Sequence, residues 1–525
     1  MTCTFQGCTN NKFAPHKECA LHCVKSNYQS DKMKGVLSEF YDLLKVHMTN
    51  CSTHSMNSMN SPRGFVIKDL KLPMPIQEQA INDDKIKALI RRARKIDSIE
   101  LCGIYFPYRD SRDDYDYFNL LKLFKEIHFI DCNFYLGDWL LDEIEFFFQN
   151  CVFHNWFYLT PIRILKNSTN SLFSECEFKD KLTVKSSEIK DVFENSLFSG
   201  GRFSSQIDLD GAKFKSEPFL ELNDKSLVNT TLKIFNCTFE EIVRINKVAL
   251  SSLWINDTNF LSGFEITNMK VGHFLCVNTE MKGVFNAFKS HFSYAKFERV
   301  KFYDVADFEK SEFGEADNIV IASYPVTAIF RFVTFMTASN FKKVNFYYGL
   351  DFESVDLREQ PNFLKSNVNP HNTNRETFRI IKYSFDSRGN TLEANRFFVQ
   401  EMKAFKNELK EEGDFWDKLV YNVNDLISEF GRNYIRPIIW LIASLILYTT
   451  LLYFHDWYFD SHNYFIHPWF NTLSAYANSA ARNFLPLSRF LESKSGFEFV
   501  SLLFYIWFGI LIWQIVVAVK RHTQR

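Results

Sequence analysis

The chain has almost no net charge, and this limits what it is expected to bind. Its 525 residues include 61 lysines and arginines against 62 aspartates and glutamates, so the formal net charge is −1. A nucleic-acid-binding protein shows a basic patch or stripe of one sign, and no part of this chain does. Nucleic acid is therefore an unlikely partner, and a solenoid that binds or mimics DNA is only a minor hypothesis.

The sequence also lacks the motifs of common enzymes. It contains no GxxxxGK[ST], GxGxxG, HExxH or GxSxG pattern, and these patterns supply phosphate loops, zinc-protease helices and nucleophile elbows. We therefore expect that the protein is not an enzyme. An apolar signal segment is missing from the N-terminus as well, which predicts a cytoplasmic N-terminal part.

Phenylalanine recurs through the middle of the chain about every five residues. The clearest run is Phe292, Phe297, Phe302, Phe308 and Phe313. This spacing fits neither the strand period of two nor the helix period of 3.6. Because a repeat this short cannot bury its apolar side chain alone, its copies must stack, and the spacing predicts a solenoid.

The repeat can be written as six residues in the order apolar, x, x, small, x, Phe. Its copies end at Phe134, Phe153, Phe178, Phe198, Phe239, Phe260, Phe302, Phe313, Phe335 and Phe346, and their small positions hold Cys132, Cys151, Cys176, Ser196, Cys237, Thr258, Val300, Ser311, Val333 and Val344. We expect the phenylalanine to fill the interior and the small residue to let the backbone turn toward the axis. Cysteine in that position acts as a small hydrophobe, which suits a reducing cytosol better than a disulfide framework.

Residues 129–365 resemble the pentapeptide-repeat family in this pattern. The resemblance implies a mainly β fold, a right-handed quadrilateral β-helix. Toward its N-terminal end the pattern returns only every 19 to 25 residues, at Phe134, Phe153 and Phe178, which predicts irregular faces or insertions. The alternative is an all-β sandwich with an aromatic core. Some members of the family are acidic mimics of DNA, and this near-neutral chain matches that role poorly.

A cluster of metal-binding residue types lies in segment 1–30, within 21 residues of one another. We favour Cys3, Cys8, Cys19 and His22 as four ligands, with Cys23 as the competitor for the fourth position. Soft and imidazole ligands at this spacing suit tetrahedral zinc, and four protein ligands close the site, so the Zn²⁺ is expected to be structural. Metal binding would supply much of the folding energy of so short a segment. Unpaired cytosolic thiols are the alternative.

Residues 31–128 are predicted to be helical and linker sequence. Residues 49–64 are polar and without pattern, which indicates a linker. Residues 83–97 show the pattern of a helix with a basic face, which most simply is a solvated face; contact with acidic lipid or RNA is the alternative.

Two apolar runs lie in segment 431–525, at 435–454 and 499–519. Each has about 20 residues, enough to cross about 30 Å of hydrocarbon as a helix. Arg432 and Arg436 flank the first run, and Lys520, Arg521 and Arg525 follow the second. Basic flanks favour the cytoplasmic side, so we predict a multi-pass protein of the inner (cell) membrane with both the N-terminal domain and the C-terminus cytoplasmic.

Residues 374–430 are predicted to be helical. They comprise a hairpin of helices at 374–387 and 391–411, divided by Gly389, and a juxtamembrane helix at 415–430. The last has a broad apolar stripe, typical of an interfacial helix or of a helix packed on the end of the solenoid. Segment 374–525 is similar to the membrane end of bacterial membrane-anchored pentapeptide-repeat proteins.

Two functional hypotheses follow. In the first, a cytosolic solenoid senses or docks a partner and gates a channel-like membrane segment. Two spans cannot enclose a pore, so this requires a homo-oligomer, and Ser474, Asn478, Ser479 and Arg482 are the candidate pore lining. In the second, the solenoid is a passive scaffold for a protein partner, tethered to membrane lipid. A role in phage defence is an analogy with the bacterial proteins only.

Overall fold

The computed structural model describes ten stretches of the chain, which fall into two compact units. The stretches are 2–58, 98–109, 116–139, 144–159, 171–186, 192–227, 229–315, 326–412, 414–461 and 497–523. The units are Met1–Asn372 and Thr373–Arg525. We describe each unit by itself.

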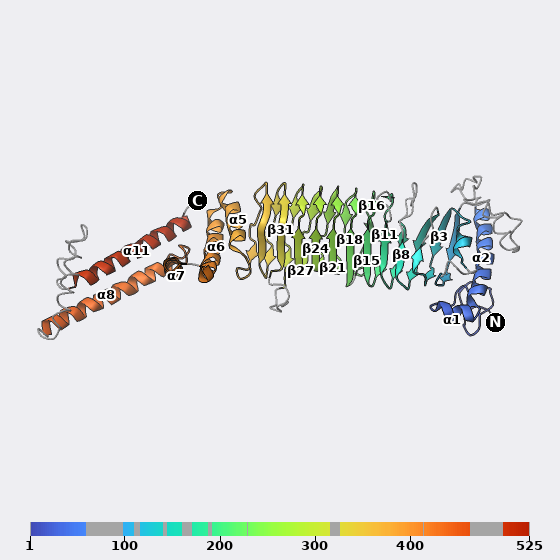
Figure 1. Cartoon of the computed structure of the whole chain (residues 1–525), viewed down its shortest axis with the longest axis horizontal. Helices are drawn as coiled ribbons and strands as arrows, with labels where there is room; N and C mark the ends of the chain where they lie inside the picture. The colour runs from blue at the N-terminus through green and yellow to red at the C-terminus, as the bar shows by residue number, and fades with distance from the viewer. Residues whose placement is uncertain are drawn as a thin grey trace. The chain divides into compact units, whose positions relative to one another are not determined.

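The first unit is a parallel β-solenoid of about ten turns, in which strands of neighbouring turns lie side by side (Figure 1). One sheet contains β1 (Ser98–Cys102), β3 (Glu126–Ile130), β6 (Glu145–Gln149), β9 (Phe173–Ser174), β13 (Phe198–Ser199) and β17 (Phe219–Leu220). A second contains β2 (Tyr105–Phe106), β4 (Asn133–Phe134), β7 (Val152–Phe153), β10 (Glu177–Phe178) and β14 (Arg202–Phe203). A third contains β20 (Val243–Arg244), β23 (Gly263–Glu265), β26 (Val284–Asn286), β29 (Ala306–Asp307) and β32 (Ser339–Asn340).

The remaining strands continue the ladder along the other sides of the turns. They are β5 (Asp138–Trp139), β8 (Phe157–Leu159), β11 (Leu182–Lys185), β12 (Val192–Phe193), β15 (Gln206–Asp210), β16 (Lys213–Phe214), β18 (Thr230–Phe235), β19 (Thr238–Phe239), β21 (Ala249–Asn256), β22 (Asn259–Phe260), β24 (Lys270–Val277), β25 (Glu280–Met281), β27 (His291–Glu298), β28 (Lys301–Phe302), β30 (Glu312–Phe313), β31 (Ala328–Phe335), β33 (Asn345–Phe346), β34 (Leu350–Leu357) and β35 (Asn367–Val368). The predicted solenoid is confirmed, and the alternative sandwich is wrong.

The register of the strands shows the length of one turn. Ala249 pairs with Lys270, and Lys270 pairs with His291, so each of these turns takes 21 residues. Phe134 pairs with Phe153, as the sequence pattern predicts. Their rings stack at 5.0 Å between centroids, close to the ~4.8 Å spacing of paired strands. The core is therefore a set of aromatic columns along the axis.

In five copies of the repeat the small residue is buried and donates to a backbone carbonyl of the preceding turn: Cys132, Cys151, Cys176, Thr258 and Ser311. The Cys132 thiol donates to the carbonyl of Leu101 at 3.2 Å, and the Ser311 hydroxyl donates to that of Ala287 at 2.6 Å. A small side chain with a donor thus fits both the space and a backbone acceptor. This explains why cysteine, serine and threonine recur there.

The residue before the small position adopts a left-handed conformation. This holds for Asp131, Asn150, Glu175, Asn236, Asp257, Asn278, Arg299 and Phe332, with φ from 47° to 54°. Asparagine and aspartate tolerate this region better than other L-residues, and a bulky residue there is an outlier. The repeat therefore contains a corner residue that the sequence pattern did not identify.

One predicted copy of the repeat is misplaced. Ser196 is only half-buried, whereas Gly201 lies next to the backbone of Cys176, where a Cβ would meet the carbonyl oxygen at 2.6 Å. Phe203, not Phe198, stacks on Phe178. The true small residue is glycine because the backbone approaches the preceding turn too closely for any side chain.

The solenoid begins before the predicted boundary at residue 129. Its first strands are β1 and β2, so residues 98–106 belong to the β-solenoid and not to a helical linker. Leu101–Phe106 follows the repeat with Ile104 in the small position, and that larger residue hid the copy. The predicted linker 49–64 is helical as far as Ser58. The predicted helix at 83–97 lies outside the described residues.

Helices lie at the first turn of the solenoid. α2 (Val36–Ser58) contacts β1, α1 (Tyr28–Met33) packs on α2, and the short α4 comprises Phe118–Leu121. Phe40 of α2 packs edge-to-face on Phe106 and Tyr117, at 6.0 and 5.9 Å between ring centroids. The phenol of Tyr117 donates to the carbonyl of Pro107 at 3.0 Å. The aromatic column is therefore covered at this end.

The second unit is helical. It contains α5 (Arg375–Asp386), α6 (Thr391–Glu412), α7 (Phe415–Ser428), α8 (Ile435–Ser461) and α11 (Glu498–Thr523). Gly389, with φ of 71°, lies in the connection of the α5–α6 hairpin, and Phe385 stacks on Phe397 at 5.6 Å across it. The predicted helices at 374–387 and 391–411 are thus confirmed.

Candidate metal centre and membrane hairpin

Two short turns bring the predicted metal ligands together. Gly7, with φ of 81°, lies in the turn between Cys3 and Cys8, where the Cys8 amide donates to the carbonyl of Phe5 at 3.1 Å. The amide of His22 donates to the Cys19 carbonyl at 3.0 Å and closes a second turn. Each turn therefore presents two ligand side chains to the other.

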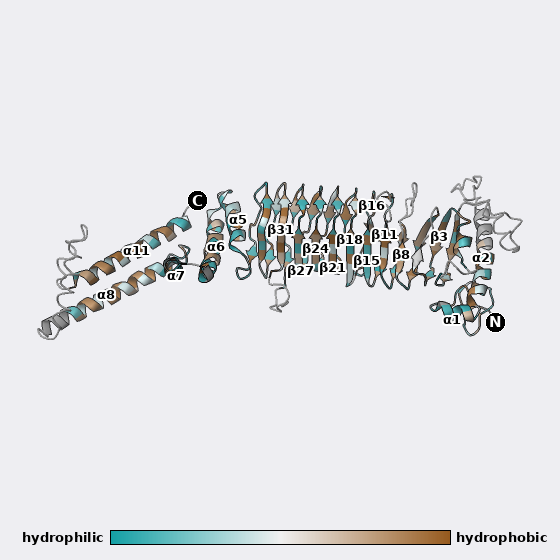
Figure 2. Ribbon diagram, viewed as in Figure 1, coloured by the Kyte–Doolittle hydropathy of each residue, from teal (hydrophilic) through white to brown (hydrophobic). Residues whose placement is uncertain are grey.

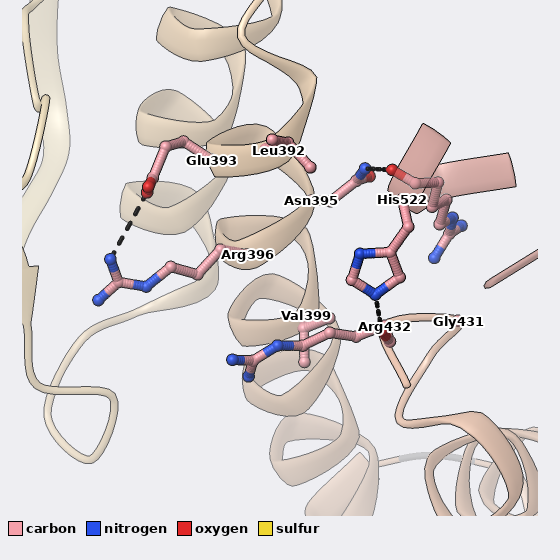
Figure 3. Close-up of a pocket in the computed structure, with 9 residues that line it drawn as sticks. Leu392, Glu393, Asn395, Arg396, Val399, Gly431, Arg432 and His522 are labelled. Atoms are coloured by element: carbon pink, nitrogen blue, oxygen red, sulfur yellow. Dashed lines mark hydrogen bonds and ion pairs between the residues drawn. The ribbon is translucent and has the colours of Figure 1, made fainter. Parts of the chain in front are cut away.

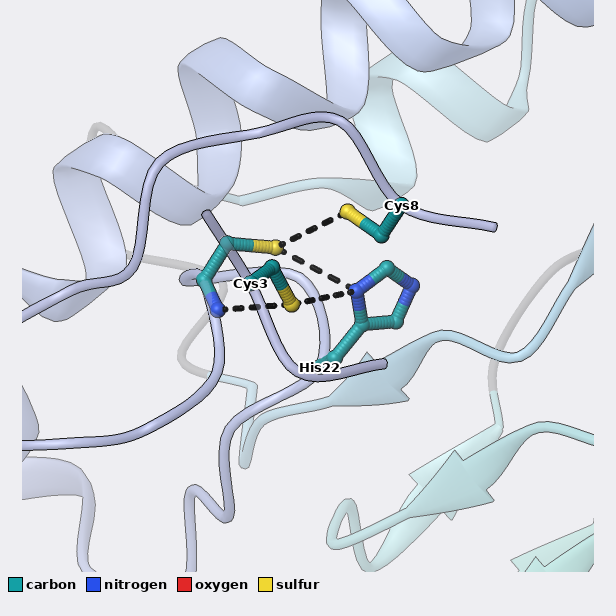
Figure 4. Close-up of side chains that lie close together, drawn as sticks. Cys3, Cys8 and His22 are labelled. Carbon is teal, nitrogen blue, oxygen red and sulfur yellow. Dashed lines mark hydrogen bonds between the residues drawn. The ribbon is translucent and has the colours of Figure 1, made fainter. Parts of the chain in front are cut away.

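The ligand atoms of Cys3, Cys8, Cys19 and His22 lie within 4.8 Å of one another and can hold a metal ion (Figure 4). The sulfurs of Cys8 and Cys19 are 3.8 Å apart. Nδ1 of His22 lies 3.2 Å from the Cys19 sulfur and 3.7 Å from the Cys3 sulfur. Cys23 does not join this cluster: its thiol faces the carbonyl of Ala20.

The titration of the cluster follows from its burial. Burial lowers the pKa of His22 to about 4, so the imidazole is neutral and can donate a lone pair to a metal. Burial also raises the pKa of Cys8 to about 12. Burial opposes ionisation of Cys3 too, but the backbone amides of Cys19 and Phe5 hold its pKa below the ordinary thiol value. A central cation would instead lower the pKa of Cys8, since a coordinating thiol is deprotonated.

Two neighbours of the cluster were not identified from the sequence. The ring of Phe5 stacks on His22 at 4.0 Å and fixes the plane of the imidazole. Lys25 is fully buried, and its ammonium donates to the carbonyls of Leu21 and Cys23 at 3.3 and 2.8 Å. Burial lowers the pKa of Lys25 to about 8. A lysine next to a cysteine-rich segment is the only sequence signal that could have indicated this supporting role.

Two candidate membrane-spanning helices form a hairpin in the second unit, Ile435–His455 within α8 and all of α11. The hydroxyl of Tyr448 donates to Ser501 at 3.0 Å, and the indole of Trp507 donates to Ser444 at 2.9 Å. Hydrogen bonds of this kind join helices in an apolar environment. Hydrophobic residues recur along both helices (Figure 2).

The basic flanks of the two helices lie together, as the sequence predicts. Nε2 of His522 donates to the carbonyl of Arg432 at 2.7 Å. Ser428 of α7 donates to Gln514 of α11 at 2.8 Å. The start of α8 and the end of α11 therefore lie at the same end of the hairpin, and α7 is hydrogen-bonded to α11 there.

The apolar stripe of the juxtamembrane helix is divided. Ile427 and Phe430 are buried within the second unit, while the remaining members are exposed. The exposed ones are Phe415, Trp416, Leu419, Val423 and Leu426. Most of the stripe is therefore available to an outside apolar phase.

The predicted pore-lining residues Ser474, Asn478, Ser479 and Arg482 lie outside the described residues. No protein-family model, curated protein or solved structure matches this chain. The cluster of candidate ligands and the hairpin of candidate membrane-spanning helices therefore have to be interpreted from their own geometry.

Proposed function

We propose that this chain is an integral protein of a bacterial inner membrane, whose solenoid senses or docks a protein partner on the cytosolic side. The outward apolar surface of α8 and α11 carries this proposal. Large side chains such as Ile439, Ile446, Leu503 and Trp513 are exposed along both helices. A soluble protein rarely exposes so large a contiguous apolar patch, whereas lipid requires one.

Membrane insertion can be tested on the full chain. We expect it to remain in the membrane fraction after alkaline carbonate extraction, while a variant lacking residues 432–525 is released. Fluorescent reporters fused to either terminus should both be active in the cytosol, because the basic flanks favour that side. Recovery of the full chain in the carbonate supernatant would refute the proposal.

The repeat family and the cross-section of the solenoid belong to this proposal. Turns of 21 residues suit four faces of about five residues each, as a quadrilateral pentapeptide-repeat β-helix has. The two left-handed corners of each regular turn, such as Asn278 and Lys289, also suit a square section. An experimental structure of the solenoid would decide both the shape of its cross-section and the handedness of its coil.

The metal is proposed to be structural zinc. Zn–S bonds of about 2.3 Å and Zn–N bonds of about 2.0 Å in a tetrahedron place sulfurs about 3.8 Å apart, and a sulfur and a nitrogen about 3.5 Å apart. The observed separations of 3.8 Å between Cys8 and Cys19, and of 3.2 and 3.7 Å from His22, surround these values. Three thiolates and a neutral imidazole would give the site one negative charge, which the buried Lys25 complements.

Phe332 favours a docking role for the solenoid. Its side chain is 61% exposed although it occupies a left-handed corner, where φ is 54°. It borders a shallow cavity of about 350 Å³ that Arg299 and Lys301 also line. Strained backbone at an exposed aromatic residue is typical of a binding position rather than of a packing solution.

A more specific version of the proposal is that the solenoid gates an oligomeric channel. It is favoured over a passive tether by the bond from Ser428 of α7 to Gln514 of α11, which links the helices preceding the membrane hairpin to the second span. Movement of α7 would therefore reach α11. The size of the protein in detergent tests this version, since two spans need several copies to enclose a pore. A monomeric protein would exclude the channel, and the passive tethered scaffold would then be the remaining function.

A further inference from the structure

A pocket lies in the second unit, where α6, the α7–α8 connection and the end of α11 meet (Figure 3). Its volume is about 180 Å³, more than ten times the ~10–15 Å³ that a cavity needs to hold one water. Its lining includes three arginines and one histidine: Arg396, Arg432, Arg521 and His522. Among the described residues that line it, Glu393 is the only carboxylate.

Backbone and ring contacts fix the basic side chains at the end of α11. The guanidinium of Arg521 lies 4.5 Å from the ring centroid of Phe398 and donates to the carbonyl of Phe430. Asn395 of α6 donates to the Arg521 carbonyl at 3.0 Å. Because a carbonyl only accepts, the bond from His522 to the Arg432 carbonyl places the proton on Nε2. The pocket is therefore built before any ligand arrives.

The charges around the pocket do not balance. Arg396 pairs with Glu393 at 3.5 Å. Glu429 lies 2.7 Å from Lys403 but 3.9 Å from Arg432.

Among the described residues, Arg521 has no carboxylate within ion-pair distance. Three arginines thus face two carboxylates, and one of these, Glu429, is held more closely by Lys403. A partly buried cation is normally paired, so an outside anion is the expected partner.

The position of the pocket indicates the source of that anion. It lies where α8 begins and α11 ends, so it is at one end of the apolar hairpin. The neighbouring α7 exposes Phe415, Trp416 and Leu426, which suit the boundary between headgroups and acyl chains. A free anion would explain the cations but not this adjoining apolar surface.

We propose that the pocket binds the phosphate of an anionic phospholipid headgroup. Guanidinium groups match phosphate oxygens in two-bond geometry, and Arg432 and Arg396 are the two that an arriving phosphate would draw from their carboxylates. Basic pockets beside spans on the cytoplasmic side recognise such headgroups. The inference rests on the proposed membrane insertion and adds a lipid preference to it.

The test uses the full chain, reconstituted in nanodiscs that contain phosphatidylcholine with or without phosphatidylglycerol. Lipids that remain bound after transfer to detergent are counted by native mass spectrometry. We expect the chain to retain phosphatidylglycerol over phosphatidylcholine, and each of R396Q and R432Q to lower that preference about fivefold, since a basic residue near an anionic surface contributes about 1 kcal/mol.

R379Q is the matched control, because Arg379 forms the same kind of ion pair three residues from a glutamate, on α5 and outside the pocket. It should leave the preference unchanged. Insertion without any preference for phosphatidylglycerol would overturn the lipid site while leaving the proposed function intact. An equal loss in R379Q would also overturn it. Stabilisation of the lipid-free protein by millimolar inorganic phosphate, without lipid preference, would assign the pocket to a free anion and overturn the lipid proposal.

Discussion

The cysteines of the N-terminal segment and those of the solenoid have different surroundings. Cys3, Cys8 and Cys19 converge on one point together with His22. Cys132 and Cys151 lie in successive turns, and each thiol donates to a separate backbone carbonyl of the turn before it. Both groups are largely buried, so burial alone does not distinguish a ligand from a packing residue.

The two regions differ in what holds their interior together. In the first group, few apolar side chains are available, and a shared cation can hold the turns together. In the second, stacked rings already fill the interior, and the thiol only completes a backbone bond. The same chemical substitution should therefore have unlike effects in the two regions.

The largest effect is expected from C19S. Serine oxygen is a poor zinc ligand beside two thiolates, and structural zinc contributes on the order of 10 kcal/mol to folding of small sites. Bound zinc, measured by elemental analysis of the full chain, should fall from one per chain to nearly none. Residues before α1 should then become sensitive to protease. A wild-type chain that is folded in this segment without metal would contradict the proposed zinc site.

A smaller loss is expected from F153A, in the middle of an aromatic column. Phe153 is buried and stacks on Phe134 and Phe178 at 5.0 and 4.6 Å. Truncation of a buried phenylalanine costs about 3–5 kcal/mol. The melting temperature of the full chain, followed by circular dichroism, should fall while zinc content stays constant. F332A makes the same change at an exposed side chain, and equal melting temperatures for the two variants would argue against the column.

A gain in stability is expected from F332N. Asparagine suits a left-handed corner and phenylalanine does not, so the free energy of unfolding should rise by about 0.5–1 kcal/mol. The reverse exchange, N150F, at the corner with φ of 52°, should lower it by a similar amount. Destabilisation by F332N would show that the ring is held by packing, and the docking role would lose its support.

A similarly small effect on stability, with none on metal content, is expected from C151S. The hydroxyl can donate to the Phe129 carbonyl as the thiol does, and serine already fills this position at Ser311. We expect a change within about 1 kcal/mol and unchanged zinc content. Because C151S and C19S are the same substitution, a loss of metal in both would remove the distinction between the two groups of cysteines.

Much of this organisation can be predicted from the sequence because its signals are local or periodic. The Phe repeat, the four clustered ligands, the paired helices α5 and α6 and the two apolar runs all follow from spacing alone. The misplaced copy at Ser196 and the missed first turn at Leu101 show the limit of prediction from spacing. The small position can hold glycine or isoleucine, and only the distance between the backbones of neighbouring turns decides which residue fits.

By itself, the sequence determined the kind of core in each part of the chain: stacked aromatics, a thiol and imidazole cluster, and an apolar hairpin. These depend on the chemistry of residues at fixed spacing. The tertiary structure alone decided which residues serve as corners, which part of the α7 stripe is buried, and that Arg396 and Arg521 line one pocket. These features depend on contacts between residues far apart in the chain, and no local pattern contains such contacts.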